Sequence, residues 1–66
     1  SGLLDVAVNG GYIIKPSNGW YMVVDKGTGE TIGNKVREKD TLNAEFWSPI
    51  FETTDFKDYI KHTYSI

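Results

Sequence analysis

The side chains in this sequence that could do chemistry are mainly basic ones, interleaved with aromatic rings near the middle of the chain. Residues 15–39 carry five basic side chains against three acidic ones, whereas residues 40–66 carry two basic and five acidic. Tyr12, Trp20 and Tyr21 lie in or beside the basic stretch. Cations approach phosphates and aromatic rings stack on bases, so this pattern favours a nucleic-acid contact. The simpler alternative is a solvated sheet face over packed aromatic residues.

The overall charge limits this interpretation. The formal net charge is −2 and the pI is near 5.1, whereas phosphate binding depends on positive charge. Any contact with nucleic acid must therefore come from the local concentration of cations.

A glycine-rich stretch, residues 27–35, superficially resembles a phosphate-binding loop. A P-loop needs four residues between its glycines and a lysine followed by Ser or Thr. Here five residues separate Gly27 from Gly33, and Asn34 stands before Lys35. We therefore expect an ordinary hairpin turn and no nucleotide site.

Other catalytic or metal-binding arrangements are also not expected. His62 is the only histidine and there is no cysteine, so a metal site would need mostly carboxylates. The spacing instead favours an exposed pair with Asp58, one helical turn away. No nucleophile stands with a general base. We predict no catalytic residue, no metal site, no cofactor in this domain and no enzyme activity for this chain.

Length and composition predict one globular domain over residues 1–66. The chain is 39% hydrophobic and 14% aromatic, which favours a folded core close to the lower size limit. Without cysteine, a reducing compartment is the simpler assumption, and we expect the cytoplasm. No apolar run approaches the roughly 20 residues that cross a bilayer, so no membrane partner is expected. The only methionine is Met22, and we expect a longer parent protein.

The first half of the chain should form a helix and a sheet meander. Leu3, Leu4, Ala7 and Val8 recur at helical spacing, Ser1 is a possible cap, and two glycines at 10 and 11 favour a left-handed stop. Glycine-containing turns and alternating apolar residues then predict three antiparallel strands. The expected strands are 12–15, 20–25 and 30–36, and the turns are 16–19 and 26–29.

The second half should form two helices. Asp40 or Thr41 is expected to cap the first, which carries Leu42, Phe46 and Trp47 and should end before Pro49. Thr54 and Asp55 should open the second. Its apolar face would hold Phe56, Tyr59, Ile60, Thr63 and Tyr64, and its polar face Lys57, Asp58, Lys61 and His62. The predicted fold class is α+β, with a short N-terminal helix, a three-stranded antiparallel sheet and two C-terminal helices.

Several segments, in order, resemble the C-terminal domain of phage UvsX-like recombinases, which are RecA-type proteins. They are residues 11–21 (GYIIKPSNGWY), 37–41 (REKDT), 46–51 (FWSPIF) and 56–60 (FKDYI). Residues 1–8 also resemble the helix with which bacterial RecA enters this domain. The Trp20-Tyr21, Ile32-Gly33 and Asn43-Ala44 pairs are similar to pairs of RecA in the same order.

The resemblance implies an accessory lobe outside the ATPase core of a recombination and repair protein, one that helps to capture duplex DNA and regulates the filament. ATP and Mg²⁺ would belong to the core of the parent, a DNA-dependent ATPase, in a host cytoplasm if phage-encoded. By position, Lys15 matches a basic DNA contact beside the hairpin turn, and Arg37 and Lys39 match the basic pair of the phage version. Bacterial RecA has a lysine where this sequence has Thr41, so that contact is either absent or transferred to Lys39.

Two functions are therefore expected as alternatives. In the first, Lys15, Lys35, Arg37 and Lys39 contact phosphates of double-stranded DNA without reading sequence, and neighbouring recombinase protomers in a filament supply multiplicity. In the second, the domain is a protein-interaction or structural lobe of the filament with little DNA contact. That alternative depends on exposure of the apolar pairs at residues 46–47 and 50–51 around Pro49.

Overall fold

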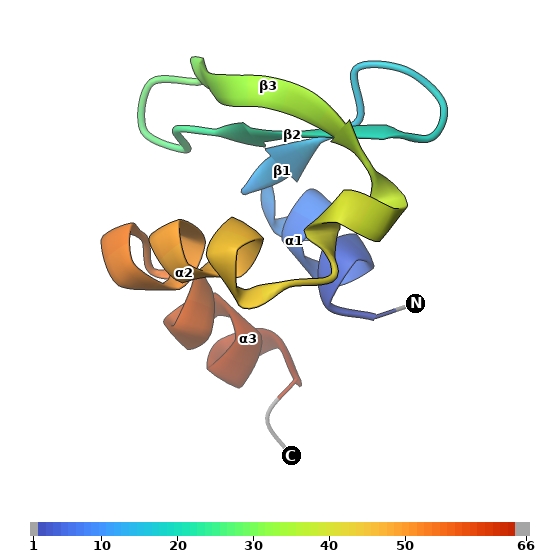
Figure 1. Ribbon diagram of the computed structural model, residues 1–66. Coiled ribbons are helices and arrows are strands. Elements are labelled where there is room, and N and C mark those ends of the chain that lie inside the picture. Colours follow the sequence, from blue (N-terminus) through green and yellow to red (C-terminus); the bar gives the residue numbers. More distant parts are fainter. Residues whose placement is uncertain (1, 65–66) are drawn as a thin grey trace.

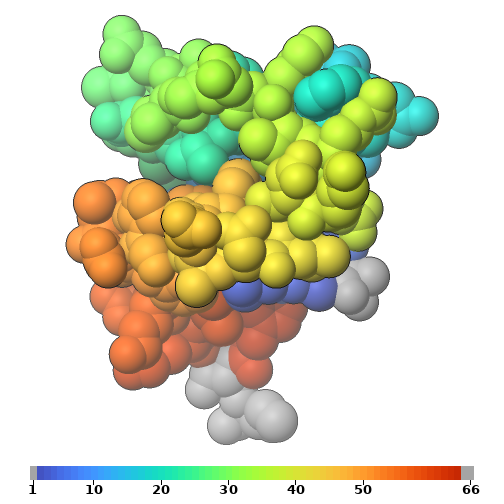
Figure 2. Space-filling view, viewed as in Figure 1, coloured from blue at the N-terminus to red at the C-terminus, as the bar shows by residue number. Residues whose placement is uncertain are grey.

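The computed structural model describes residues 2–64, which form two layers. All three α-helices lie on one side of a three-stranded sheet (Figure 1), and the space-filling view shows the green sheet layer above the orange and red helices (Figure 2). The expected α+β architecture is confirmed. The elements are α1 (Leu3–Gly10), β1 (Ile13–Ile14), β2 (Trp20–Val24), β3 (Thr31–Arg37), a 3-10 helix η1 (Glu38–Thr41), α2 (Ala44–Thr53) and α3 (Phe56–Tyr64).

Helix α1 ends at the glycine pair, as expected. Gly11 adopts a left-handed conformation, with φ of 84°, which a residue without a β-carbon adopts at little cost. The amides of Gly11 and Tyr12 then donate to the carbonyls of Val8 and Ala7. These bonds close the helix and direct the chain into β1. The expected cap, Ser1, lies outside the described residues.

The sheet is the expected antiparallel meander, with strand order β1-β2-β3. Both predicted turns are present between the strands, although β1 is shorter than expected. Trp20 pairs with Arg37 and Tyr21 with Val36, but Val23 pairs with Ile32. Met22 alone therefore faces residues 33–35 on β3, so β3 bulges at this point, where Gly33 has a φ of 76°. A bulge of this kind increases the local twist of a sheet.

The start of the middle helix differs from the sequence-based expectation. Asn43, not Asp40 or Thr41, caps α2, and its side-chain oxygen accepts the Phe46 amide at 2.8 Å. Thr41 is instead buried at the end of η1, where its hydroxyl donates to the carbonyl of Glu38. Its own carbonyl accepts the indole N–H of Trp47. The Thr41 hydroxyl is thus engaged within η1 and its carbonyl is held by Trp47, so Thr41 does not cap α2.

The expected end of the middle helix was also wrong, because α2 continues through Pro49 to Thr53. A proline inside a helix removes one backbone hydrogen bond and costs about 3 kcal/mol. Continuing the helix buries Ile50, which is only 2% exposed, and packs Phe46 and Trp47 against the core. Burial of large apolar side chains contributes about 1.5–3 kcal/mol each, so packing offsets the cost of Pro49.

Helix α3 begins where expected, since the Thr54 hydroxyl accepts the Phe56 amide. Its apolar face is buried only over the first two turns. Phe56 is fully buried and Tyr59 and Ile60 are half-buried, whereas Thr63 and Tyr64 are exposed. The helix is therefore anchored by its N-terminal half.

The core lies between the sheet and the helices, and Tyr12 is at its centre. The Tyr12 ring lies 4.8 Å from Phe56 and 5.6 Å from Tyr59, measured between ring centres. Its hydroxyl donates to the carboxylate of Asp55 and accepts from the ammonium of Lys26. The remaining buried hydrophobic residues of this cluster are Ala7, Ile13, Tyr21 and Ile50.

Candidate nucleic-acid interface

Two of the predicted cations, Lys35 and Arg37, converge on one aromatic ring. The Lys35 ammonium lies 4.8 Å from the centre of the Trp20 ring, and the guanidinium carbon of Arg37 lies 4.1 Å from it. Residues directly opposite one another in an antiparallel pair share a face of the sheet, and Trp20 is the direct partner of Arg37. The sheet pairing therefore brings these two cations together.

This pair of cations lies on the open face of the sheet. Tyr21 is buried toward the helices, and successive residues of a strand point to opposite faces, so Trp20 points away from the helices. None of the helices covers that side of the sheet (Figure 1). Within residues 2–64, no carboxylate forms an ion pair with Lys35 or Arg37. Both side chains are therefore accessible to an external anion.

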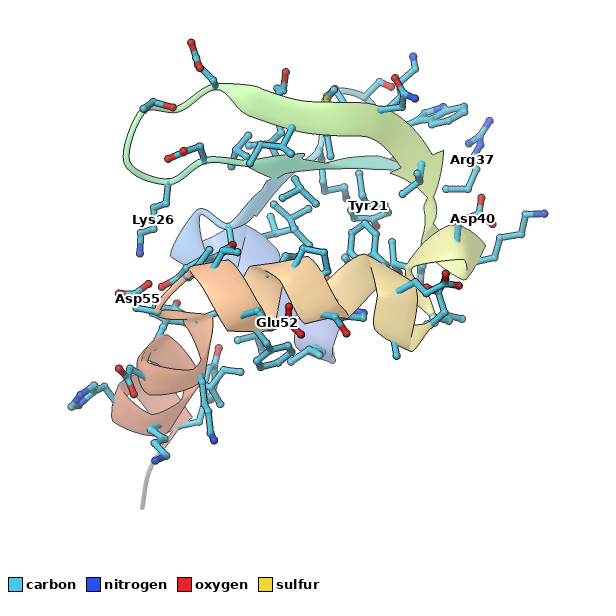
Figure 3. The ribbon with its side chains drawn as sticks, turned by 60° about the vertical axis from the view of Figure 1, so that its left-hand side comes forward. Tyr21, Lys26, Arg37, Asp40, Glu52 and Asp55 are labelled. Atoms are coloured by element: carbon cyan, nitrogen blue, oxygen red, sulfur yellow. The ribbon has the colours of Figure 1, made fainter. Side chains whose placement is uncertain are left out.

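Lys15 lies at the same end of the sheet but on the other side. Its ammonium is 5.5 Å from the centre of the Tyr21 ring, and Figure 3 shows Tyr21 between the sheet and α2. The side chain itself is exposed beside the turn that leads into β2. Strand β2 thus separates Lys15 from the cations on Trp20, and the four predicted residues do not form one flat patch.

Lys39 is exposed on η1, next to the end of β3. Glu38 and Asp40 flank it along the chain, and Figure 3 shows Asp40 at the same end of the molecule as Arg37. The formal charges of residues 37–40 cancel. Any local positive potential at η1 therefore depends on the longer reach of the arginine and lysine side chains.

The first part of the glycine-rich stretch is a hairpin turn, as predicted, and its second part, from Thr31, belongs to β3. The amides of Gly27 and Thr28 donate to the Asp25 carboxylate at 2.8 and 3.1 Å. A phosphate-binding loop needs such amides free to face the ligand. An internal carboxylate occupies them here, so these two amides are not free to face a phosphate.

Lys26 is one of the five basic residues of the stretch 15–39, but it was not among the predicted site residues. It contacts the core residue Tyr12 instead. Its ammonium lies 4.3 Å from the centre of the Tyr12 ring and 3.2 Å from the Tyr12 hydroxyl. Burial, and then the hydrogen bond to Asp55, raise the pKa of Tyr12 above its ordinary value, whereas Lys26 acts in the opposite direction. Figure 3 shows Lys26 and Arg37 at opposite ends of the sheet.

Two surface hollows border the core. One, of about 450 Å³, lies between α1, η1 and the start of α2 and includes Leu3 and Leu42; these two side chains are 40% and 77% exposed. The other, of about 500 Å³, lies between the β2–β3 turn and the end of α2 and includes Ile32, which is 54% exposed. Exposed apolar residues beside a hollow are typical of contact surfaces.

Residues 2–64 contain no group of three or more His, Asp or Glu side chains placed to hold a metal ion. No helix in that range is long and apolar enough to cross a bilayer.

The two-layer α+β fold, with basic and aromatic residues at one end of its sheet, agrees with the class of recombinase C-terminal domain that the sequence resembles. Residues 1–60 match the family described as the C-terminal domain of the bacteriophage T4 recombination and repair protein, UvsX, and the chain belongs to this family. The recombination and repair protein of Enterobacteria phage T4 is 44% identical to it over 70 aligned residues. The alignment includes the whole of this chain but only 18% of that relative. The resemblance found in the sequence is thus confirmed.

Proposed function

We propose that this chain is the accessory DNA-binding and regulatory domain of a RecA/UvsX-type recombination and repair protein, and that it captures double-stranded DNA through sequence-independent phosphate contacts. One observation carries the proposal. Lys35 and Arg37 stand together on an uncovered sheet face, in a chain that belongs to the UvsX C-terminal family. Lys15, on the helix-facing side, and Lys39, on η1, would add contacts at the same end of the sheet.

The kind of contact follows from the elements that carry the cations. A helix that reads base edges must enter the major groove with several side chains. Here the cations stand on a strand, on a turn and on a single turn of 3-10 helix. Lysine and arginine presented in this way suit phosphate oxygens, which position a protein on DNA without reading sequence.

Charge distribution supports an orientation for the bound domain. The acidic residues of the second half, such as Glu45, Glu52 and Asp58, belong to the helical layer. Binding through the open sheet face would direct these carboxylates away from the phosphates. They would also restrain binding in other orientations, because like charges repel.

Two to four phosphate contacts give a weak complex, with a dissociation constant on the order of 10⁻⁴ M and a strong dependence on salt. Many copies of the domain along a filament would raise the effective affinity through local concentration. Neighbouring protomers are therefore partners in this function. ATP hydrolysis, with its Mg²⁺, would belong to a core outside these 66 residues, in the cytoplasm of the host.

An NMR titration of the chain with a short duplex tests the proposal. Amide shifts should change at Lys15 and at residues 35–39, and the changes should fade as salt is added. Absence of any change at millimolar duplex would reject the proposal.

A second candidate, a protein-contact lobe of the filament, is favoured by one observation. Of the apolar pairs around Pro49, Phe46 and Trp47 are half-buried and Ile50 is buried, so these three residues mainly fill the core, whereas Phe51 is 38% exposed. Leu42, in contrast, is 77% exposed beside the 450 Å³ hollow. If this surface contacts a neighbouring protomer, Leu42→Ser in the complete recombinase should weaken filament assembly but leave duplex binding by this chain unchanged.

A further inference from the structure

Two cationic groups from the neighbouring strand, β3, lie over the partly exposed ring of Trp20. The distances to the ring centre are 4.8 Å for Lys35 and 4.1 Å for Arg37. Both are within the range of about 6 Å over which a cation is attracted by an aromatic face. The tryptophan thus brings together two charges that would otherwise repel each other.

The turn before β2 also restricts the position of the Arg37 guanidinium. A β-carbon built on Gly19 would lie 3.1 Å from Nη1 of Arg37. Gly19 has no side chain, so the arginine can lie close to the backbone of the turn. The guanidinium therefore lies beside both the Trp20 ring and this backbone.

Holding the two cations in advance has a consequence for binding. A free lysine or arginine side chain loses rotamer freedom when it grips a ligand, and this loss weakens the complex. A contact between a cation and an aromatic ring restricts the side chain without using its N–H donors. Those donors stay available to phosphate oxygens.

We propose that Trp20 is a positioning residue, which holds Lys35 and Arg37 as a preorganised pair for the phosphodiester groups of DNA. The inference rests on the proposed function, because it concerns the same site. The ring itself does not need to touch the nucleic acid. The quadrupole of the ring attracts the two cations, and its apolar bulk is not what holds them.

Two substitutions separate these properties of the ring. Trp20→Phe keeps an aromatic face, whereas Trp20→Leu keeps apolar bulk and removes the face. Ile14→Ala is the matched control, since Ile14 pairs with Met22 on the same open face, is 38% exposed and offers no aromatic ring to a cation. Circular dichroism and thermal melting should show that all three variants are folded.

Duplex binding by the chain is then measured by fluorescence anisotropy at several salt concentrations. Trp20→Leu should weaken binding about three- to ten-fold, the range expected when one or two cation–π contacts are lost. The slope of log affinity against log salt should not change, because every cation is still present. Trp20→Phe should retain most of the affinity of the unaltered chain, and Ile14→Ala should bind as tightly as the unaltered chain.

Each other outcome has a definite meaning. Equal affinity of a folded Trp20→Leu and the unaltered chain overturns the positioning role while leaving the proposed function intact. Failure of the unaltered chain to bind duplex rejects the proposed function and this role with it. If Trp20→Leu does not fold, the ring-current shift of the Arg37 and Lys35 methylene protons decides. An upfield shift in the unaltered chain that persists in Trp20→Phe supports the role, and ordinary shifts in the unaltered chain overturn it.

Discussion

The hydroxyl of Tyr12 donates a hydrogen bond to the carboxylate of Asp55, a residue 43 positions away in the chain. Tyr12 directly precedes β1, and Asp55 lies between α2 and α3. Lys26, from the turn between β2 and β3, donates to the same hydroxyl. One phenol therefore connects the first strand, the second hairpin and the junction of the last two helices, at the end of the sheet opposite to Arg37.

Removal of this hydroxyl should destabilise the fold without opening a cavity. Tyr12→Phe keeps the ring contacts with Phe56 and Tyr59 but leaves Asp55 and Lys26 without their shared partner. Hydrogen bonds to charged groups contribute about 1.5–3 kcal/mol, and the exposure of Asp55 allows water to replace part of this. We expect the free energy of unfolding in urea to fall by about 1–2 kcal/mol. An unchanged unfolding midpoint would show that the connection contributes nothing to stability.

The same tyrosine predicts a loss of stability in alkali. The folded pKa of Tyr12 lies above the ordinary value of 10.0, because of burial and the bond to Asp55. Above that value the unfolded chain releases the phenolic proton first, so the free energy of unfolding decreases as the pH rises through the folded pKa. The free energies of unfolding of the unaltered chain and of Tyr12→Phe are compared in urea as the pH is raised through this range. The stability advantage over Tyr12→Phe should shrink with rising pH, and a constant difference would contradict the shift.

Gly10 is required for space at the end of α1. A β-carbon there would lie 2.8 Å from ring carbons of both Tyr12 and Tyr59. Gly10→Ala would gain up to about 1 kcal/mol in helix propensity, but overpacking a core costs about 1–3 kcal/mol. We expect a net loss of thermal stability. The matched control is Gly2→Ala, where nothing lies within 4 Å of the added carbon; a gain in melting temperature for Gly10→Ala would refute the steric argument.

Pro49 should be replaceable with a gain in stability. Pro49→Ala restores a helix N–H and removes a penalty of about 3 kcal/mol, while a more flexible unfolded chain costs about 1 kcal/mol. We expect the free energy of unfolding to rise by about 2 kcal/mol, measured by chemical denaturation. A decrease would mean that the proline ring packs favourably at the 500 Å³ hollow that it borders.

The charge of Arg37 should be visible in the salt dependence of duplex binding. Arg37→Gln removes one phosphate contact, so the slope of log affinity against log salt should fall by about 0.9. Lys57→Gln makes the same change in charge on the exposed surface of α3, in the helical layer. It should leave the slope unchanged. Equal effects of the two substitutions would indicate a general response to net charge instead of a contact at the sheet.

Local chemistry was enough to predict the order and type of most elements. The glycines after α1 and in both hairpin turns specify their conformations through the backbone alone, and Thr54 caps α3 through its own hydroxyl. The family resemblance was likewise contained in short strings of residues. None of these features depends on contacts between distant parts of the chain.

Tertiary packing decided the features for which sequence reasoning was wrong or incomplete. Asn43 replaces Asp40 and Thr41 as the cap because Thr41 is buried with Trp47 on its carbonyl, and α2 passes through Pro49 because its continuation buries Ile50. The arrangement of the basic residues was decided in the same way. Strand register and the bulge in β3 place Lys35 and Arg37 on Trp20 and leave Lys15 on the other side. Register depends on which faces can be buried against the helices, and only the folded chain provides that burial.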